Sequence, residues 1–510
     1  MDDARRVQMA RAATVVMVAF VASRVLGLGR EMIIGNQFGT SRELDAYLAA
    51  FRIPDLIFQL IAGGALGSAF IPTFTSYLAH DDRREAWHLA SAVANIAVVV
   101  LTVCAVLATL LAPQLVSHVV APGFAPEEQV LTVRLMRLML ICPIVFGISG
   151  IVMGILNSFQ HFLLPALAPA IYNLSIIAGA ALLAPVIGIY GLVVGVVAGS
   201  FLHLLIQLPE LVRKGLTYQA TLDISHPGVR EIGRLMLPRV FGLAAVQLNF
   251  LVSTLLASTL AGGSLAALNY AWMLMLLPQG IFATAIATAA FPTFSELAAR
   301  GQLEELRRVL SDALRLILYL TIPASLGLIV LGKPLIQLLL QRGQFDSAST
   351  QAVAWALQFF ALGLFAHSAL EIVARAFYSL HDTRTPVLVG VGAMILNISL
   401  SLLLIGPMLH GGLALANSIA AIIETLLLLV ILRTRLGGLE GKGLILSVTK
   451  TSLATLVMGS GVLWFQALAL DSPMIIQAGG AMLFGGALFV VTSLLLRSEE
   501  LVLLRDIVKR

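Results

Sequence analysis

The chain has 510 residues, of which 59% are hydrophobic and 12% are charged, and its formal net charge is +5. Soluble domains carry about 25% charged residues, whereas residues 138–209 and 240–295 contain no Asp, Glu, Lys or Arg. A soluble surface cannot be built from such stretches, so the composition excludes a soluble protein and predicts an integral membrane protein. Its basic residues then report membrane topology rather than nucleic-acid binding.

Runs of about 20 apolar residues are long enough to cross a bilayer as helices. Their number predicts an all-α integral membrane protein with 14 transmembrane helices. The first run follows a basic N-terminus without a small-residue cleavage site, so we interpret it as an uncleaved span. The two longest runs exceed one crossing and are expected to be tilted, bent or extended into water. The predicted spans are 10–35, 43–76, 88–112, 129–157, 163–183, 188–210, 230–255, 263–296, 307–331, 349–378, 386–405, 411–434, 445–467 and 475–497.

The loops on the two sides of the membrane differ in basic charge. Arg42, Lys333 and Arg342 lie in loops on one side, while the other loop Lys and Arg residues lie on the side of the termini. Because basic loops stay in the cytoplasm, both termini are predicted to be cytoplasmic. We therefore expect a multi-pass protein of the cytoplasmic membrane.

An internal repeat relates the two halves of the chain. Pro72-Thr-Phe recurs at Pro292, and Gly191-Leu recurs at Gly412, with offsets of 220 and 221 residues. Six spans are an even number, so both halves insert with the same orientation and form two six-helix lobes, a parallel repeat with a substrate path between them. The predicted domains are an N-terminal lobe at 1–215, a C-terminal lobe at 216–437 and a C-terminal helix pair at 438–510.

Charged residues within the spans are candidate binding residues, because a charge near the bilayer centre costs about 2.5–3.5 kcal/mol on insertion scales. Two glycines lie between Arg24 and Arg30 and would let the helix bend and turn both guanidiniums toward one cavity. For Arg30, Asp45 and Arg239, reaching out to a membrane interface is the alternative interpretation. The planar arginine fork suits phosphate, so the cargo is predicted to be anionic. The candidate substrate-binding residues are Arg24, Arg30, Asp45, Arg52 and Arg239.

The sequence contains no motif of an enzyme. The patterns GxxxxGK[ST], HExxH, CxxC and GxSxG do not occur, and the nine histidines lack metal-ligand spacing. The chain is therefore predicted to be a transporter without a catalytic or metal site.

Several segments resemble the MurJ/MviN lipid II flippase family of the MOP exporter superfamily, which also contains the MATE multidrug exporters. These segments are SRVLGLGRE at 23–31, DAYLAAFRIPD at 45–55, GGALGSAFIPTF at 63–74, APGF at 121–124, ILNSFQHFLLPALAP at 155–169 and RAFYSLHDTRTPV at 375–387.

The resemblance implies a cargo and a role. The cargo is lipid II, an undecaprenyl-diphosphate-linked disaccharide-pentapeptide. It would be moved from the inner to the outer leaflet of the bacterial cytoplasmic (inner) membrane by alternating access, for peptidoglycan biosynthesis. In the family, cavity charges match Arg24, Arg30 and Asp45, and the terminal helix pair forms a groove for the polyprenyl tail.

The chain departs from the charge pattern of proteobacterial members. Met273 and Leu276 stand where those members have arginine and glutamate in span 8. Phe58 and Gly63 stand where they have arginine and glutamate in span 2. Arg239 is a candidate to supply the positive charge that is absent at Met273. No cofactor is predicted, and Na+ or membrane-potential coupling stays open.

Other functions remain as alternatives. One is a flippase for another polyprenyl-diphosphate oligosaccharide, and another is a MATE-like multidrug or cation antiporter, which the arginine excess disfavours. A non-transporting membrane scaffold is disfavoured by the repeat with charges inside its spans. The expected partners are a lipid-linked anionic substrate and membrane lipids, without nucleic acid, and the sequence does not specify the oligomeric state.

Overall fold

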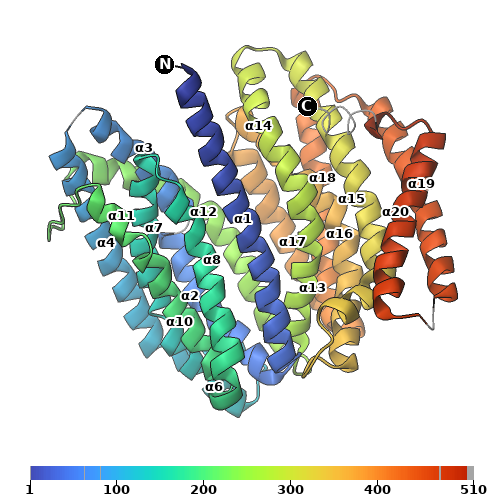
Figure 1. Ribbon diagram of the computed structural model, residues 1–510, viewed down its shortest axis with the longest axis horizontal. Helices are drawn as coiled ribbons and strands as arrows, with labels where there is room; N and C mark the ends of the chain where they lie inside the picture. Colours follow the sequence, from blue (N-terminus) through green and yellow to red (C-terminus); the bar gives the residue numbers. More distant parts are fainter. Residues whose placement is uncertain (1, 63, 81, 470–471, 502–510) are drawn as a thin grey trace. The chain divides into compact units, whose positions relative to one another are not determined.

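The computed structural model describes residues 2–62, 64–80, 82–469 and 472–501, without the side chains of residues 2–18, 20, 64–66, 68, 238, 239 and 241. Most of the described residues lie in helices, and none forms a β-strand. They make two compact units, Met1–Gly263 with Arg342–Phe345 and Ser264–Gln341 with Asp346–Arg510. We refer to them as unit 1 and unit 2, and Figure 1 labels most of their helices.

Unit 1 is a bundle in which α8 packs between α1 and α10, and α7 contacts α3, α4 and α10. In the same unit, α2 packs against α6 and α12, and α12 also contacts α3. The helices are α1 (Asp2–Phe38), α2 (Arg42–Ile61), α3 (Gly64–Ala79), α4 (Arg83–Leu110), α5 (Ala112–Leu115), α6 (Pro126–Met139), α7 (Cys142–Ser158), α8 (Leu163–Ala178), α9 (Ala184–Ile187), α10 (Ile189–Leu205), α11 (Leu208–Arg213) and α12 (Pro227–Ser258), with π-helical turns at Val116–Val120 and Gly179–Leu183.

Unit 2 is centred on α16, which packs against α13, α15 and α18. The last two helices, α19 and α20, pack on each other and on α15, where Tyr319, Met458 and Phe489 share an apolar cluster. The helices are α13 (Ser264–Pro278), α14 (Thr284–Ala299), α15 (Leu303–Leu339), α16 (Ser347–Ser379), α17 (Arg384–Met408), α18 (His410–Arg435), α19 (Gly441–Leu468) and α20 (Ala481–Leu495), with π-helical turns at Gln279–Ala283 and Ile476–Gly480.

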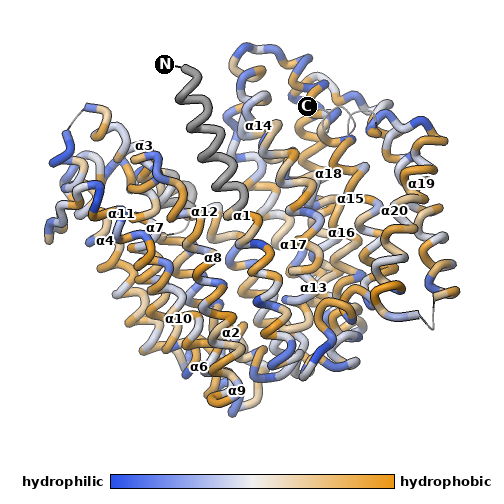
Figure 2. The backbone as a smooth tube through the Cα atoms, in the orientation of Figure 1, coloured by the Kyte–Doolittle hydropathy of each residue, from blue (hydrophilic) through white to orange (hydrophobic). Residues whose placement is uncertain are grey.

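The prediction of an all-α membrane protein is confirmed. Within the described residues, 11 helices are long and apolar enough to cross a membrane, or 12 if the two parts of α12 form one bent span. Figure 2 shows hydrophobic residues along the helices and hydrophilic residues gathered at their ends and connections. The long predicted span 43–76 is divided into α2 and α3, and the long span 263–296 is α13 and α14 joined by a π-helical turn. Such turns are a known cause of helix bending.

The internal repeat has a counterpart in local geometry. Gln160 and His381, which end the turns after α7 and α16, have φ angles of 57° and 59°. Gly188 (φ 60°, ψ −142°) and Leu409 (φ 54°, ψ −135°) precede α10 and α18. Both pairs are separated by the same 221 residues found in the sequence repeat. Positive φ is uncommon outside glycine, and these two pairs occur at the spacing of the sequence repeat.

In the second pair, Leu409 adopts this backbone conformation although it carries a side chain. Its backbone occupies a region that is favourable for glycine and costs other residues about 1–3 kcal/mol. We expect Leu409→Gly to raise the free energy of unfolding by about 1 kcal/mol, seen as a higher Tm of the purified protein. The matched control is Gly188→Leu, which should lower the Tm. An unchanged or lower Tm for Leu409→Gly would contradict this account.

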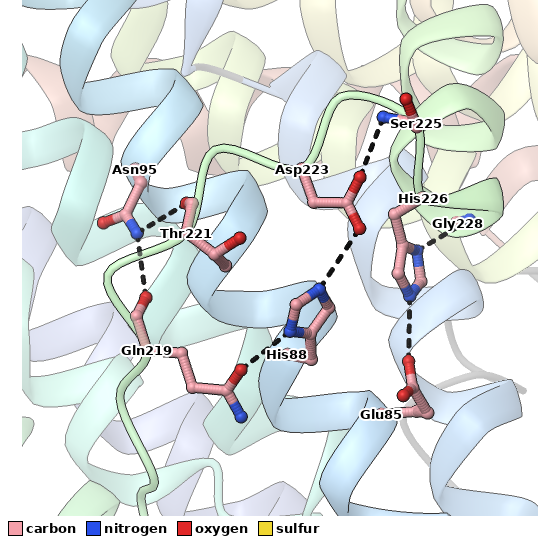
Figure 3. Close-up of polar contacts among 9 residues, drawn as sticks. All are labelled: Glu85, His88, Asn95, Gln219, Thr221, Asp223, Ser225, His226 and Gly228. Carbon is pink, nitrogen blue, oxygen red and sulfur yellow. Dashed lines mark hydrogen bonds and ion pairs between the residues drawn. The ribbon is translucent and has the colours of Figure 1, made fainter.

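The connection between α11 and α12 is hydrogen-bonded to α4 (Figure 3). Asn95 of α4 donates hydrogen bonds to two carbonyl oxygens of the connection, those of Gln219 and Thr221, at 3.0 and 2.9 Å. His88 pairs with Asp223 at 3.3 Å, and His226 pairs with Glu85 at 3.2 Å. The hydrogen bond from His88 lowers the pKa of the Asp223 carboxyl, because it stabilises the ionised form. The path of this connection is therefore fixed within unit 1.

Candidate substrate-binding site

Arg30 is held by polar partners on α1 and α8. Its Nε and Nη2 donate to Glu31 Oε1 at 3.2 and 2.5 Å, and its Nη1 donates to Asn173 Oδ1 at 3.0 Å. The Asn173 amide also donates to the carbonyl of Ser23 at 3.3 Å. One buried amide on α8 thus bonds to a backbone carbonyl of α1 and to the Arg30 guanidinium. This fixes the Arg30 side chain, which is 28% exposed.

Arg24 lies on the same helix, and its side chain is exposed. The helix α1 runs without interruption through the glycines between Arg24 and Arg30. The helix is therefore unbroken at these glycines. Six residues of continuous helix separate the two positions by about 120° around the axis. Arg30 is hydrogen-bonded to Asn173 of α8, and the side chain of Arg24 is exposed.

Asp45 is almost fully buried, with 2% exposure, in the first turns of α2. Its Oδ2 accepts a hydrogen bond of 2.6 Å from the backbone N–H of Gly263, which follows α12. Gly263 has a φ of +91° and approaches the carbonyl oxygen of Thr40 too closely to accept a Cβ. The carboxylate therefore ties a glycine-dependent turn to the start of α2.

Arg52 lies further along α2 and faces α12. Its Nε donates to Thr254 Oγ1 at 2.8 Å, and its guanidinium carbon lies 5.6 Å from the centre of the Phe250 ring. A cation over an aromatic face is attracted by the ring, so Arg52 is held in place by α12. Arg239 belongs to α12, but its side chain is outside the described part of the chain.

A cavity of about 490 Å³ lies within unit 1, close to this part of α2. Asp55, one turn after Arg52, lines it, and so does Phe58. The other walls come from α3, α7, α8 and α10. Phe58 is one of the positions where the sequence departs from the expected charge pattern, so this wall of the site is aromatic rather than basic.

A family model described as lipid II flippase MurJ matches residues 34–476. The chain belongs to the MurJ family. The lipid II flippase MurJ of Burkholderia cenocepacia is 32% identical over 425 residues, covering 81% of each chain. The probable lipid II flippase MurJ of Vibrio cholerae is 30% identical over 431 residues, covering 82% of each chain.

Solved structures agree with membership of the MurJ family. A lipid II flippase MurJ in an inward closed conformation superposes with a TM-score of 0.81 at 26% identity, covering 94% of this chain and 98% of that one. An inward-facing MATE multidrug transporter of the MOP superfamily has a TM-score of 0.69 at 15% identity, covering 83% and 98%. The similarity to the MATE transporter concerns the fold alone. The match to the MurJ family model favours the flippase hypothesis over the MATE-like alternative.

Sequence reasoning found the charged residues of this MurJ-family chain but missed the neutral residues that hold them. Asn173 and Thr254 are neutral, so nothing in the sequence marks them as partners of a charge. The contact from Arg30 to Asn173 spans 143 residues of sequence and the contact from Arg52 to Thr254 spans 202. A single sequence gives no means of pairing positions so far apart. Arginines inside apolar spans did imply that polar partners must exist.

Proposed function

We propose that this chain is a lipid II flippase, which moves the undecaprenyl-diphosphate-linked disaccharide-pentapeptide from the inner to the outer leaflet by alternating access. The family match over residues 34–476 carries the proposal. Arginines on the membrane helices α1 and α2 suit a diphosphate, because their forks donate paired, charge-assisted hydrogen bonds. We assign cargo binding to Arg24, Arg30, Arg52 and Arg239.

Asp45 belongs to the same proposed site, and we assign it a positioning role through its bond to Gly263. The helix α12 belongs by sequence to the second repeat, yet it packs against α2 and α3 of the first. In an alternating-access cycle, contacts of this kind would be made in one state and released in another. Loss of the Arg52–Thr254 bond would then accompany opening between α2 and α12.

Depletion of the protein tests the function directly. If the chain is the flippase, lipid II accumulates in the inner leaflet on depletion, and peptidoglycan synthesis stops. Accumulation of a different polyprenyl-diphosphate oligosaccharide would assign another cargo. Proteoliposomes with lipid II labelled in one leaflet provide the matching measurement in vitro, and absence of protein-dependent movement there would contradict the proposal.

The finer architecture is part of the proposal. Fourteen spans would form lobes at 1–215 and 216–437 and a terminal pair at 438–510, with a groove for the polyprenyl tail at that pair. The packing of α19 and α20 on each other and on α15 supports a separate terminal pair. We propose that the protein has no resident cofactor. We propose a Na+ gradient or the membrane potential as its energy source.

The proposed topology places both termini in the cytoplasm and the connection between α19 and α20 outside. In a background with Cys104→Ser and Cys142→Ser, a membrane-impermeant maleimide should label Ser472→Cys in intact spheroplasts. Arg213→Cys, on the proposed cytoplasmic side, is the control and should react only after permeabilisation. The reverse pattern would overturn the orientation, and labelling of both sites in intact spheroplasts would overturn the span count.

A further inference from the structure

The cavity in unit 1 has the size of a small-molecule site. Its volume of about 490 Å³ lies within the range of roughly 300–1,000 Å³ that ligand pockets occupy. Its lining is mostly apolar, with a few polar groups on α2, α8 and α10. Pockets that bind organic ligands have this composition, in which apolar walls exclude water and a small number of polar atoms fix orientation.

Asp55 is the acidic residue of this lining. Its Oδ1 accepts one long hydrogen bond, 3.4 Å from Gln59 Nε2, and within the described residues it forms no ion pair. Arg52, one turn earlier, donates from its Nε to Thr254, so it attracts Asp55 by charge without forming an ion pair with it. A carboxylate inside a membrane bundle is costly unless it is paired or hydrogen-bonded. Asp55 therefore presents an incompletely compensated negative charge to the cavity.

Aromatic rings face the same space. The ring centres of Phe58 and Phe146 are 5.5 Å apart, and those of Phe146 and Tyr172 are 5.2 Å apart. The planes within these pairs are inclined by 53° and 82°, so the wall offers ring faces in more than one direction. Ring faces attract cations through their negative quadrupole, and several rings around one position form a cage for ammonium groups.

A metal ion does not suit this lining. Hard cations take several oxygen ligands at short distance, and the described residues contain no group of three or more His, Cys, Asp or Glu placed to hold a metal. The volume also exceeds what a single ion fills. A carboxylate beside inclined aromatic rings, in a pocket of ligand size, is the chemistry that recognises an organic ammonium group.

We propose that this cavity binds an organic ammonium group. This group belongs to an amine on the peptide portion of the lipid-linked cargo, an assignment that rests on the proposed flippase function. Such a cargo carries negative charge on its diphosphate and positive charge on the amine. Arg52 and Asp55 present the two complementary charges one turn apart on α2. The cavity would thus select for the headgroup, while arginines bind the diphosphate common to all polyprenyl-linked sugars.

The experiment compares two cargo forms and three versions of the full-length protein in nanodiscs. The probes are amine-bearing lipid II and the same lipid acetylated on that amine, with binding followed by microscale thermophoresis. Asp55→Asn removes the charge and keeps the shape. The matched control is Glu424→Gln, which removes a carboxylate from a separate cavity of about 370 Å³ between α17 and α18.

We expect acetylation to weaken binding to the wild-type protein and to Glu424→Gln about tenfold, as loss of a desolvated cation–carboxylate contact implies. Asp55→Asn should bind the amine form about tenfold more weakly and should not distinguish the two forms, because the two changes remove one shared interaction. The acetylation arm needs no variant, so it holds even if Asp55→Asn does not fold.

Equal binding of both cargo forms by the wild-type protein would overturn the cargo amine as the ligand while leaving the flippase proposal intact. Failure of the wild-type protein to bind either form would instead count against the flippase function. Tetramethylammonium provides a third arm. Saturable binding that depends on Asp55, without discrimination between the cargo forms, would support an ammonium site but assign it to a free organic cation. No Asp55-dependent binding of any probe would overturn the site altogether.

Discussion

Replacing Arg24 with lysine is expected to abolish complementation of a strain depleted of this protein, at normal protein levels in the membrane. Lysine keeps the positive charge but not the planar fork that donates two parallel hydrogen bonds to phosphate. Losing one charge-assisted hydrogen bond costs about 1.5–3 kcal/mol, which is roughly a ten- to hundredfold loss of cargo affinity. The side chain of Arg24 is exposed, so the substitution leaves the packing of α1 largely unchanged.

Three comparisons sharpen the Arg24 experiment. Arg213→Lys is the control, because that side chain is 79% exposed beside Glu210 outside the proposed site. Arg30→Lys should lose function as well, since lysine cannot reach Glu31 and Asn173 together with the same geometry. If Arg30 instead only reaches a membrane interface, which is the alternative interpretation of its sequence position, lysine would be tolerated there. Full rescue by Arg24→Ala at normal levels would remove Arg24 from the mechanism.

The fold could be predicted from sequence because its main determinant is one-dimensional. A bilayer excludes charge and water, so apolar runs locate helices such as α4 and α16 directly. Breaks within the long runs were harder, because nothing in 43–76 marks where α2 ends and α3 begins beyond a pair of glycines. The ends of most helices extend past the apolar run, as in α15, since polar residues continue a helix into water.

The site could be predicted only in part, for a different physical reason. Arg24 and Arg52 stood out because a charge among apolar residues is costly wherever the chain folds. What each charge contacts depends on tertiary packing, and Asp45 illustrates the limit. Its sequence setting suggested contact with cargo, whereas its carboxylate bonds to the backbone of Gly263, far away in the chain. The cavity next to Asp55 likewise required helices from five places in the sequence.

Removing the side chain of Asp45 is expected to have the second large effect, this time on the amount of folded protein. Asp45→Ala leaves the buried N–H of Gly263 without its carboxylate acceptor, which costs about 1–3 kcal/mol. It also removes a negative charge from the first turn of α2, where such charges stabilise a helix. We expect a Tm several degrees lower and reduced levels in the membrane, measured on detergent-solubilised protein and by immunoblot.

The Asp45→Asn variant separates a positioning role from direct contact with cargo. Asparagine retains an acceptor oxygen at the position of Oδ2, so the bond to Gly263 can form and the Tm should stay near that of the wild-type protein. If Asp45 acts by holding the turn after α12, Asp45→Asn also keeps most of the transport activity. If its negative charge acts on the cargo or on an arginine, the variant folds normally but fails to complement. We expect the first outcome, because a side chain with 2% exposure that bonds to a backbone N–H has little surface left for a ligand.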